Sequence, residues 1–261
     1  MIKEINSIKF NYKGKEIIDE KLQEKIDKNW KELLNKSELF HESDILIVTN
    51  LKNKENDFEI EIKESKFSHY MYAKITEEIN IQTLFSGAYI LTSDGYVVCN
   101  VSKYYIDNKL EEVINLVGGM SDLKDIVNGE YSCENNLKRE FKEELGIDLN
   151  DNHWKIKLKY LKYPSEKENP IAYPVGTIYE AKTTHTKDEV EHLFKTTNHD
   201  NETSRLIYFN KENYKDIYNY KQKKQYIPEL WERIFNWKWI KWTPVYTGVF
   251  CRLKSKNKKT N

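Results

Sequence analysis

The chain has 261 residues, enough for one large domain or for an ordinary domain with a smaller region attached. Its 42 Lys and Arg residues balance its 42 Asp and Glu residues, so no overall positive field is present to hold nucleic acid or an anionic membrane. Aromatic residues make up 13% of the chain, more than a disordered chain carries, and predict a globular fold.

Targeting and redox features are absent from the sequence. No apolar run approaches the roughly 20 residues that span a bilayer, and the first residues lack the apolar core of a signal peptide. The three cysteines are scattered, with no CxxC pair, which argues against a disulfide framework or a zinc site. We therefore expect a cytoplasmic protein with neither a membrane nor a nucleic-acid partner.

The first part of the chain predicts a small α+β region over residues 1–80. Apolar residues recur at helical spacing in one segment, and Phe58, Ile60 and Ile62 alternate as in a strand. The expected elements are a strand over 5–12, a helix over 17–34, a hairpin of strands 44–49 and 57–62, and a connecting helix or loop over 63–80.

A second block, residues 81–250, predicts a larger α/β domain, and a basic tail over 251–261 is expected to be disordered. An Asp-Gly turn joins the first two strands, and Ser132 and Gly146 are suitable residues for the two ends of a helix. The expected elements are strands 88–92, 96–100 and 115–120, a helix over 132–145, strands 154–161 and 172–181, a helix over 187–194, a strand over 205–209 and a helix over 228–235.

The chemistry is concentrated on the helix expected over 132–145. Glu140, Glu143 and Glu144 are three and four residues apart, so they share one face, and their like charges repel. A hard divalent cation would neutralise them, and Mg²⁺ prefers such carboxylate oxygens, with Mn²⁺ as an alternative ion. The competing interpretation is an acidic helix face that is simply solvated.

A wider pattern contains this helix. Gly118-Gly119 follows a strand, an acidic residue lies near a turn, and residues 139–147 read REFKEELGI. This arrangement resembles the Nudix box, and its second half matches at every defined position. The resemblance implies an α/β/α sandwich with a mixed sheet. It also implies Mg²⁺-dependent hydrolysis of a diphosphate bond in a nucleoside diphosphate linked to another moiety.

The resemblance also assigns roles to residues. Glu140, Glu143 and Glu144 would bind the metal, and Glu140 would be either a ligand or the base that acts on water. Arg139 would orient a glutamate through a charge-assisted hydrogen bond. The glycine pair Gly118-Gly119 would let the backbone approach the helix or the ligand closely.

One part of the box departs from the family spacing. About six extra residues separate the glycine pair from Arg139, and counting back from Arg139 places Tyr131 at the first acidic position. Glu130 is one residue away, so either a bulge allows Glu130 to serve or this acid is missing. For the additional acid that many members recruit outside the box, Glu202 is the best candidate, ahead of Glu189 and Glu191.

The ligand is less well defined by the sequence. The overall layout resembles that of UDP-glucose-type Nudix hydrolases, which suggests a small-molecule nucleotide and, as in many Nudix proteins, a homodimer. Tyr70, Tyr72 and Tyr173 could stack on a base, although packing is the favoured role for each. Two alternatives to the hydrolase remain, a Nudix-fold module that binds a nucleotide without turnover and an interaction domain.

Overall fold

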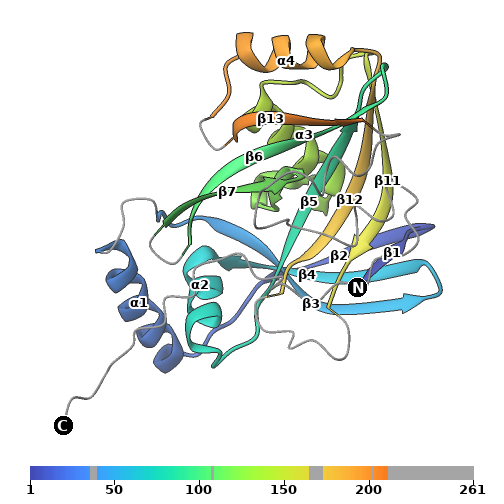
Figure 1. Cartoon of the computed structure of the whole chain (residues 1–261). Coiled ribbons are helices and arrows are strands. Elements are labelled where there is room, and N and C mark those ends of the chain that lie inside the picture. The colour runs from blue at the N-terminus through green and yellow to red at the C-terminus, as the bar shows by residue number, and fades with distance from the viewer. Residues whose placement is uncertain (36–39, 107–108, 165–172, 201–202, 211–261) are drawn as a thin grey trace, which may run out of the picture.

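One mixed β-sheet runs through the computed structural model, which describes residues 1–35, 40–106, 109–164, 173–200 and 203–210 (Figure 1). Most neighbouring strands are antiparallel, whereas β12–β5 and β2–β4 are parallel. The fold is therefore α+β with a mixed sheet, as the sequence predicts. Its strands are β1 (Ile2–Glu4), β2 (Ser7–Lys15), β3 (Asp44–Lys54), β4 (Asp57–Lys66), β5 (Gln82–Leu91), β6 (Tyr96–Ile106), β7 (Lys109–Asn115), β8 (Val117–Met120), β11 (Trp154–Lys162), β12 (Val175–Thr183) and β13 (Thr203–Asn210).

The helices flank this sheet, and a separate two-stranded hairpin lies between the 3-10 helix and the helix that follows it. The hairpin pairs β9 (Ile126–Val127) with β10 (Glu130–Tyr131). The helices are α1 (Glu20–Leu34), α2 (Phe67–Thr76), the short 3-10 helix η1 (Leu123–Asp125), α3 (Cys133–Leu145) and α4 (Lys187–Thr196).

Strand β5 is the centre of the sheet. Its first half pairs with β3 and β8, its last residues pair with β6, and β12 runs parallel beside it. Strands β7 and β13 extend the sheet from β6. The glycine-bearing strand β8 therefore lies against the middle of the sheet, where a helix can cover it.

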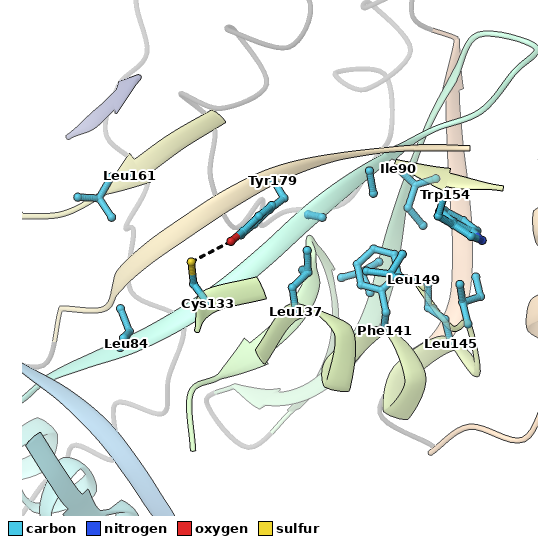
Figure 2. Close-up of a cluster of buried hydrophobic side chains, with 14 of the residues drawn as sticks. Leu84, Ile90, Cys133, Leu137, Phe141, Leu145, Leu149, Trp154, Leu161 and Tyr179 are labelled. Atoms are coloured by element: carbon cyan, nitrogen blue, oxygen red, sulfur yellow. Dashed lines mark hydrogen bonds between the residues drawn. The ribbon is translucent and has the colours of Figure 1, made fainter. Parts of the chain in front are cut away.

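Helix α3 covers one face of the sheet with its apolar side. Leu137, Phe141 and Leu145 are fully buried and pack with residues of β5, β11 and β12, as Figure 2 shows. Cys133 at the start of the helix makes a hydrogen bond of 2.8 Å with the Tyr179 hydroxyl. The apolar spacing predicted from the sequence is thus confirmed. Because Leu137, Phe141 and Leu145 occupy the side of α3 that packs on the core, the glutamates lie on another side of the helix.

The amino-terminal region shares this sheet. Strand β1 pairs with β11, and β3 pairs with β5. A second apolar cluster, which contains Leu33, Tyr70 and Met71, packs α1 and α2 against β3. The sheet is therefore continuous across residue 80, and the division into regions 1–80 and 81–250 stays a prediction.

Most expected elements are present, but β1, β7, η1 and the β9–β10 hairpin were not expected, and the first helix begins later than expected. Ile17 is 93% exposed and lies before α1, because Asp19 caps the helix by accepting a hydrogen bond from the Leu22 backbone. The helix expected over 228–235 and the tail over 251–261 lie outside the described residues. Among the helices that the structure describes, none has the length and apolar character needed to cross a membrane.

Candidate active site

Local sequence signals determine where α3 begins and ends. The Ser132 hydroxyl accepts a hydrogen bond from the Asn135 backbone at 3.3 Å, which satisfies one of the free donors of the first turn. Gly146 ends the helix in the left-handed conformation, with φ of 69°. The helix therefore has the length and the phase that the sequence predicts for the three glutamates.

Two of these glutamates are buried against β8. Glu140 and Glu144 are four residues apart, so they lie on one side of α3, and they are 8% and 5% exposed. The Glu144 carboxylate accepts a hydrogen bond of 3.0 Å from the Gly118 backbone. The Glu140 carboxylate lies so close to Gly119 that a Cβ atom there would be 2.3 Å from its Oε2.

The glycine pair makes this close approach possible. Gly118 has φ of 145°, and a Cβ atom at this position would lie 2.1 Å from the Ser86 carbonyl oxygen on β5. A side chain at Gly119 would instead occupy the position of the Glu140 carboxylate. Each glycine thus admits a different close neighbour, the Ser86 backbone at Gly118 and the Glu140 carboxylate at Gly119.

Asn100 supplies a second donor to Glu144. Its side-chain nitrogen donates hydrogen bonds to Glu144 Oε2 at 3.1 Å and to Thr203 Oγ1 at 3.2 Å. Asn100 is 1% exposed, and its carbonyl oxygen Oδ1 has no hydrogen-bond partner in the described part of the chain. Sequence reasoning missed this residue because it belongs to β6, far from the box along the chain.

Arg139 connects the carboxylates with the preceding loop. Its guanidinium donates to both carboxylate oxygens of Asp125, at 3.0 and 3.2 Å, and to the Met120 carbonyl oxygen at 3.1 Å. It also lies 2.7 Å from Glu140 and 2.8 Å from Glu143. Burial opposes the charge of Arg139, but its hydrogen bonds to Asp125 and the charges of the neighbouring carboxylates prevail and raise its pKa.

Asp125, rather than Glu130, is therefore the acid that supports Arg139 from the loop. Asp125 is 1% exposed, whereas Glu130 is exposed. The six extra residues can be located, since residues 126–131 form the β9–β10 hairpin. The Ser132 backbone donates to the Asp125 carbonyl oxygen at 3.2 Å across its base. The spacing of the box placed its first acid at residue 131. Subtracting the six residues of the hairpin places this acid at residue 125.

Glu143 differs from the other two glutamates. Its side chain is 46% exposed and its carboxylate is directed to Arg139. Within the described ranges, no group of three or more His, Cys, Asp or Glu side chains is arranged to hold a metal ion. The structure therefore buries Glu140 and Glu144 against β8, pairs Arg139 with Glu140 and Glu143, and leaves Glu143 at the exposed edge of the site.

The acids proposed from outside the box have different positions. Glu202 lies outside the described residues. Glu189 closes the capping box of α4 with Thr186, and Glu191 accepts a hydrogen bond of 2.6 Å from the Tyr208 hydroxyl. The Glu189 carboxylate thus takes part in capping α4, and the Glu191 carboxylate connects α4 with β13.

The tyrosines considered for base stacking are placed as well. Tyr70 and Tyr72 are buried in α2, at 1% and 4% exposure, which agrees with the favoured packing role. Tyr173 is partly exposed, and the Lys162 ammonium lies 5.0 Å from the centre of its ring.

Comparison with known proteins returns similarity in structure only. No family model and no curated protein matches the chain. Similar solved structures include a NUDIX-family hydrolase from Clostridium perfringens, with 17% identity over 52% of this chain and 85% of that chain and a TM-score of 0.30. A NUDIX hydrolase from Nitrosomonas europaea has 16% identity over 59% and 86%, with a TM-score of 0.37.

A third similar structure is the NUDIX domain of Shewanella oneidensis NrtR, which was solved with ADP ribose. It has 12% identity over 59% of this chain and 86% of that chain, with a TM-score of 0.35. All three of these similar structures are described as NUDIX proteins. Because all three TM-scores are below 0.5, the functional assignment rests on the residues of this chain.

Proposed function

We propose that the chain is a Mg²⁺-dependent hydrolase of the Nudix type. Its reaction would be hydrolysis of a diphosphate bond in a nucleoside diphosphate linked to another moiety, with a nucleotide sugar as one candidate. The water oxygen would form a bond to one phosphorus while the bond from that phosphorus to the bridging oxygen breaks. The products would be a nucleoside monophosphate and a phosphorylated remainder.

The observation that carries the proposal is the buried carboxylate pair Glu140 and Glu144 against the glycine pair of β8. Burying carboxylates is costly, so such a pair is uncommon unless positive charge and hydrogen bonds accompany it. Arg139 provides one positive charge beside Glu140. A solvated acidic helix face, the competing interpretation, would leave these two side chains exposed, and it is disfavoured by their burial.

The donor atoms fit a hard divalent cation. Glu140 and Glu144 offer buried carboxylate oxygens from one side of α3, and the half-exposed Glu143 carboxylate shares Arg139 with Glu140. Oxygen donors of these kinds are the ones that Mg²⁺ and Mn²⁺ take. When bound, the ion would stabilise the charge that develops on the phosphate oxygens.

The side chains of the site would divide the remaining work. Glu144 would hold the cation, because two N–H donors fix its carboxylate. Glu140 would be a second ligand or would accept a proton from the attacking water. Arg139 would keep Glu140 in place and, through Asp125, attach α3 to the loop that precedes it.

The proposal is tested by product detection over a nucleotide panel with and without Mg²⁺. The panel contains UDP-sugars, ADP-ribose, NAD, dinucleoside polyphosphates and nucleoside triphosphates. We expect Mg²⁺-dependent turnover of one class, and Glu144→Gln should lower it about 100-fold or more while the protein stays folded. Glu134→Gln is the matched control, since Glu134 lies on the same helix and forms an exposed ion pair with Lys138.

A nucleotide-binding module without turnover is the second candidate. It is favoured by the position of Glu143, which is half-exposed and directed to Arg139 rather than gathered with the other two glutamates. A panel member that raises the melting temperature in Mg²⁺ but is not hydrolysed would support this candidate. Equal turnover by the wild type and by Glu144→Gln would exclude the proposed site.

A further inference from the structure

The side chain of Asn100 is unusual for its position. It lies in the middle of β6, between Cys99 and Val101, and both of these neighbours are fully buried. Alternation along the strand places Asn100 on the same face as Val98, which belongs to the apolar cluster under α3. An apolar residue would suit this face as well, so the fold alone does not require an amide here.

The hydrogen bonds of Asn100 use its donor group fully. The side-chain nitrogen has two hydrogens, and it donates to two acceptors, Glu144 Oε2 and Thr203 Oγ1. A carboxylate oxygen only accepts, so the amide must present its nitrogen to Glu144. The orientation of the side chain is thereby determined, and its carbonyl oxygen is left buried without a hydrogen-bond partner in the described part of the chain.

The same Glu144 oxygen receives the Gly118 backbone N–H at 3.0 Å. Two donors from different strands, β6 and β8, therefore converge on one atom of a side chain that belongs to α3. Such an arrangement fixes the rotation of the carboxylate, which α3 alone would leave adjustable. Thr203 connects the arrangement to the first residue of β13.

We propose that Asn100 is a positioning residue, which holds the Glu144 carboxylate in the orientation needed for metal binding and turnover. This inference rests on the proposed function. A buried polar group that lacks one of its partners needs an explanation, and a site that must orient a ligand provides it. Groups that orient metal ligands change affinity or activity by about 10–100-fold when they are removed.

The test compares Asn100→Leu with Val98→Ala. Both changes alter buried residues on the same face of β6, but only the first removes a donor to Glu144. We expect Asn100→Leu to lower kcat about 10–100-fold with KM changed less than about threefold, whereas Val98→Ala lowers the melting temperature and keeps kcat within about twofold. The substrate is the panel member that the wild type hydrolyses.

A second readout does not depend on turnover. The Mg²⁺ concentration that gives half of the thermal shift is expected to rise about 10–100-fold in Asn100→Leu and to stay unchanged in Val98→Ala. Asn100→Val, which is apolar, suits a strand and cannot donate, serves if the leucine variant does not fold. It should show the same losses.

The possible outcomes separate the two proposals. If the wild type hydrolyses a panel member and both Asn100 variants keep its kcat and Mg²⁺ dependence, the positioning role is overturned and the hydrolase stands. If kcat falls equally in Asn100→Leu and Val98→Ala in proportion to lost stability, the role is purely structural and the inference is again overturned. A wild type without turnover on the panel overturns the inference together with the proposed function.

Discussion

At the scale of single residues, Arg139 joins parts of the site that are distant in the sequence. Its guanidinium contacts carboxylates on α3 and on η1 and a carbonyl oxygen at the end of β8. Its side chain is 19% exposed and Asp125 is nearly inaccessible, so the Arg139–Asp125 pair is a buried ion pair. Removing one partner of such a pair leaves the other charge buried without compensation.

We therefore predict that Asp125→Asn lowers the free energy of unfolding by roughly 3 kcal/mol, the lower end of the range for broken buried pairs, because Glu140 and Glu143 still contact Arg139. Urea denaturation would measure the change. Lys124→Gln is the control, since this neighbouring side chain is 72% exposed and its ion pair should contribute less than about 1 kcal/mol. Unchanged stability in Asp125→Asn would contradict the assignment of Asp125.

The site residues differ in how far the sequence could predict them. Glu140 and Glu144 follow from helical spacing, because one helix fixes their relation whatever surrounds it. Asn100 lies 44 residues before Glu144, and the pairing of strands, rather than local spacing, brings them together. A lone asparagine in a strand carries no local signal of this kind, so its role could be recognised only from the structure.

At the scale of elements, β8 pairs with β5 and is contacted by α3, and its two glycines therefore face different neighbours. Gly118 faces the backbone of β5, which cannot move aside without breaking the pairing of the two strands. Gly119 faces the end of the Glu140 side chain, which can rotate away. The two positions should therefore respond to the same substitution in different ways.

We predict that Gly118→Ala destabilises the protein by about 3 kcal/mol or more, since the added methyl group is strained by a positive φ and by the Ser86 carbonyl oxygen. Thermal or urea unfolding would measure this loss. A variant with the melting temperature of the wild type would show that β8 can move away from β5.

For Gly119→Ala we expect a folded protein with impaired function. The methyl group displaces the Glu140 carboxylate, so Mg²⁺-dependent turnover should fall at least about tenfold while the cost in stability stays near 1–2 kcal/mol. Activity and unfolding would be measured on the same preparation. Full activity in this variant would mean that the position of Glu140 is not important for turnover.

The elements themselves were predicted with uneven success, for a physical reason. Helix α3 was predicted correctly because its cap, its apolar spacing and its terminal glycine all agree. The β9–β10 hairpin was missed because strands of two residues show no alternation. Its turn does carry a signal, since Asn128 and Gly129 have φ of 54° and 81°, as an Asn-Gly turn requires.

At the scale of the whole molecule, the apolar core is shared between the two regions expected from the sequence. Leu46, Ile60 and Ile62 from the first region pack in the same cluster as Leu137 and Phe141 from the second. The Met1 ammonium also donates to the Tyr163 carbonyl oxygen at 2.8 Å. Composition and periodicity predict elements and their faces, but they do not show that β1 and β3 join strands from the second region.

We predict that residues 81–261 alone do not unfold cooperatively, because removal of residues 1–80 would expose part of the shared core and the edges of β5 and β11. Circular dichroism melting and hydrogen exchange would test this. Coexpression of the fragment with residues 1–80 should restore the transition. A fragment that melts like the full chain would instead establish the amino-terminal region as a separable domain.

The hairpin over residues 126–131 has a consequence for how such sites can be found. Its two ends are one backbone hydrogen bond apart, between Ser132 and Asp125, so the loop can vary in length while the acid and Arg139 keep their contact. A search that counts residues between the two would reject this chain. A search by the distance in space between a buried acid and the helix arginine would accept it, and would also accept other proteins that carry insertions at this point.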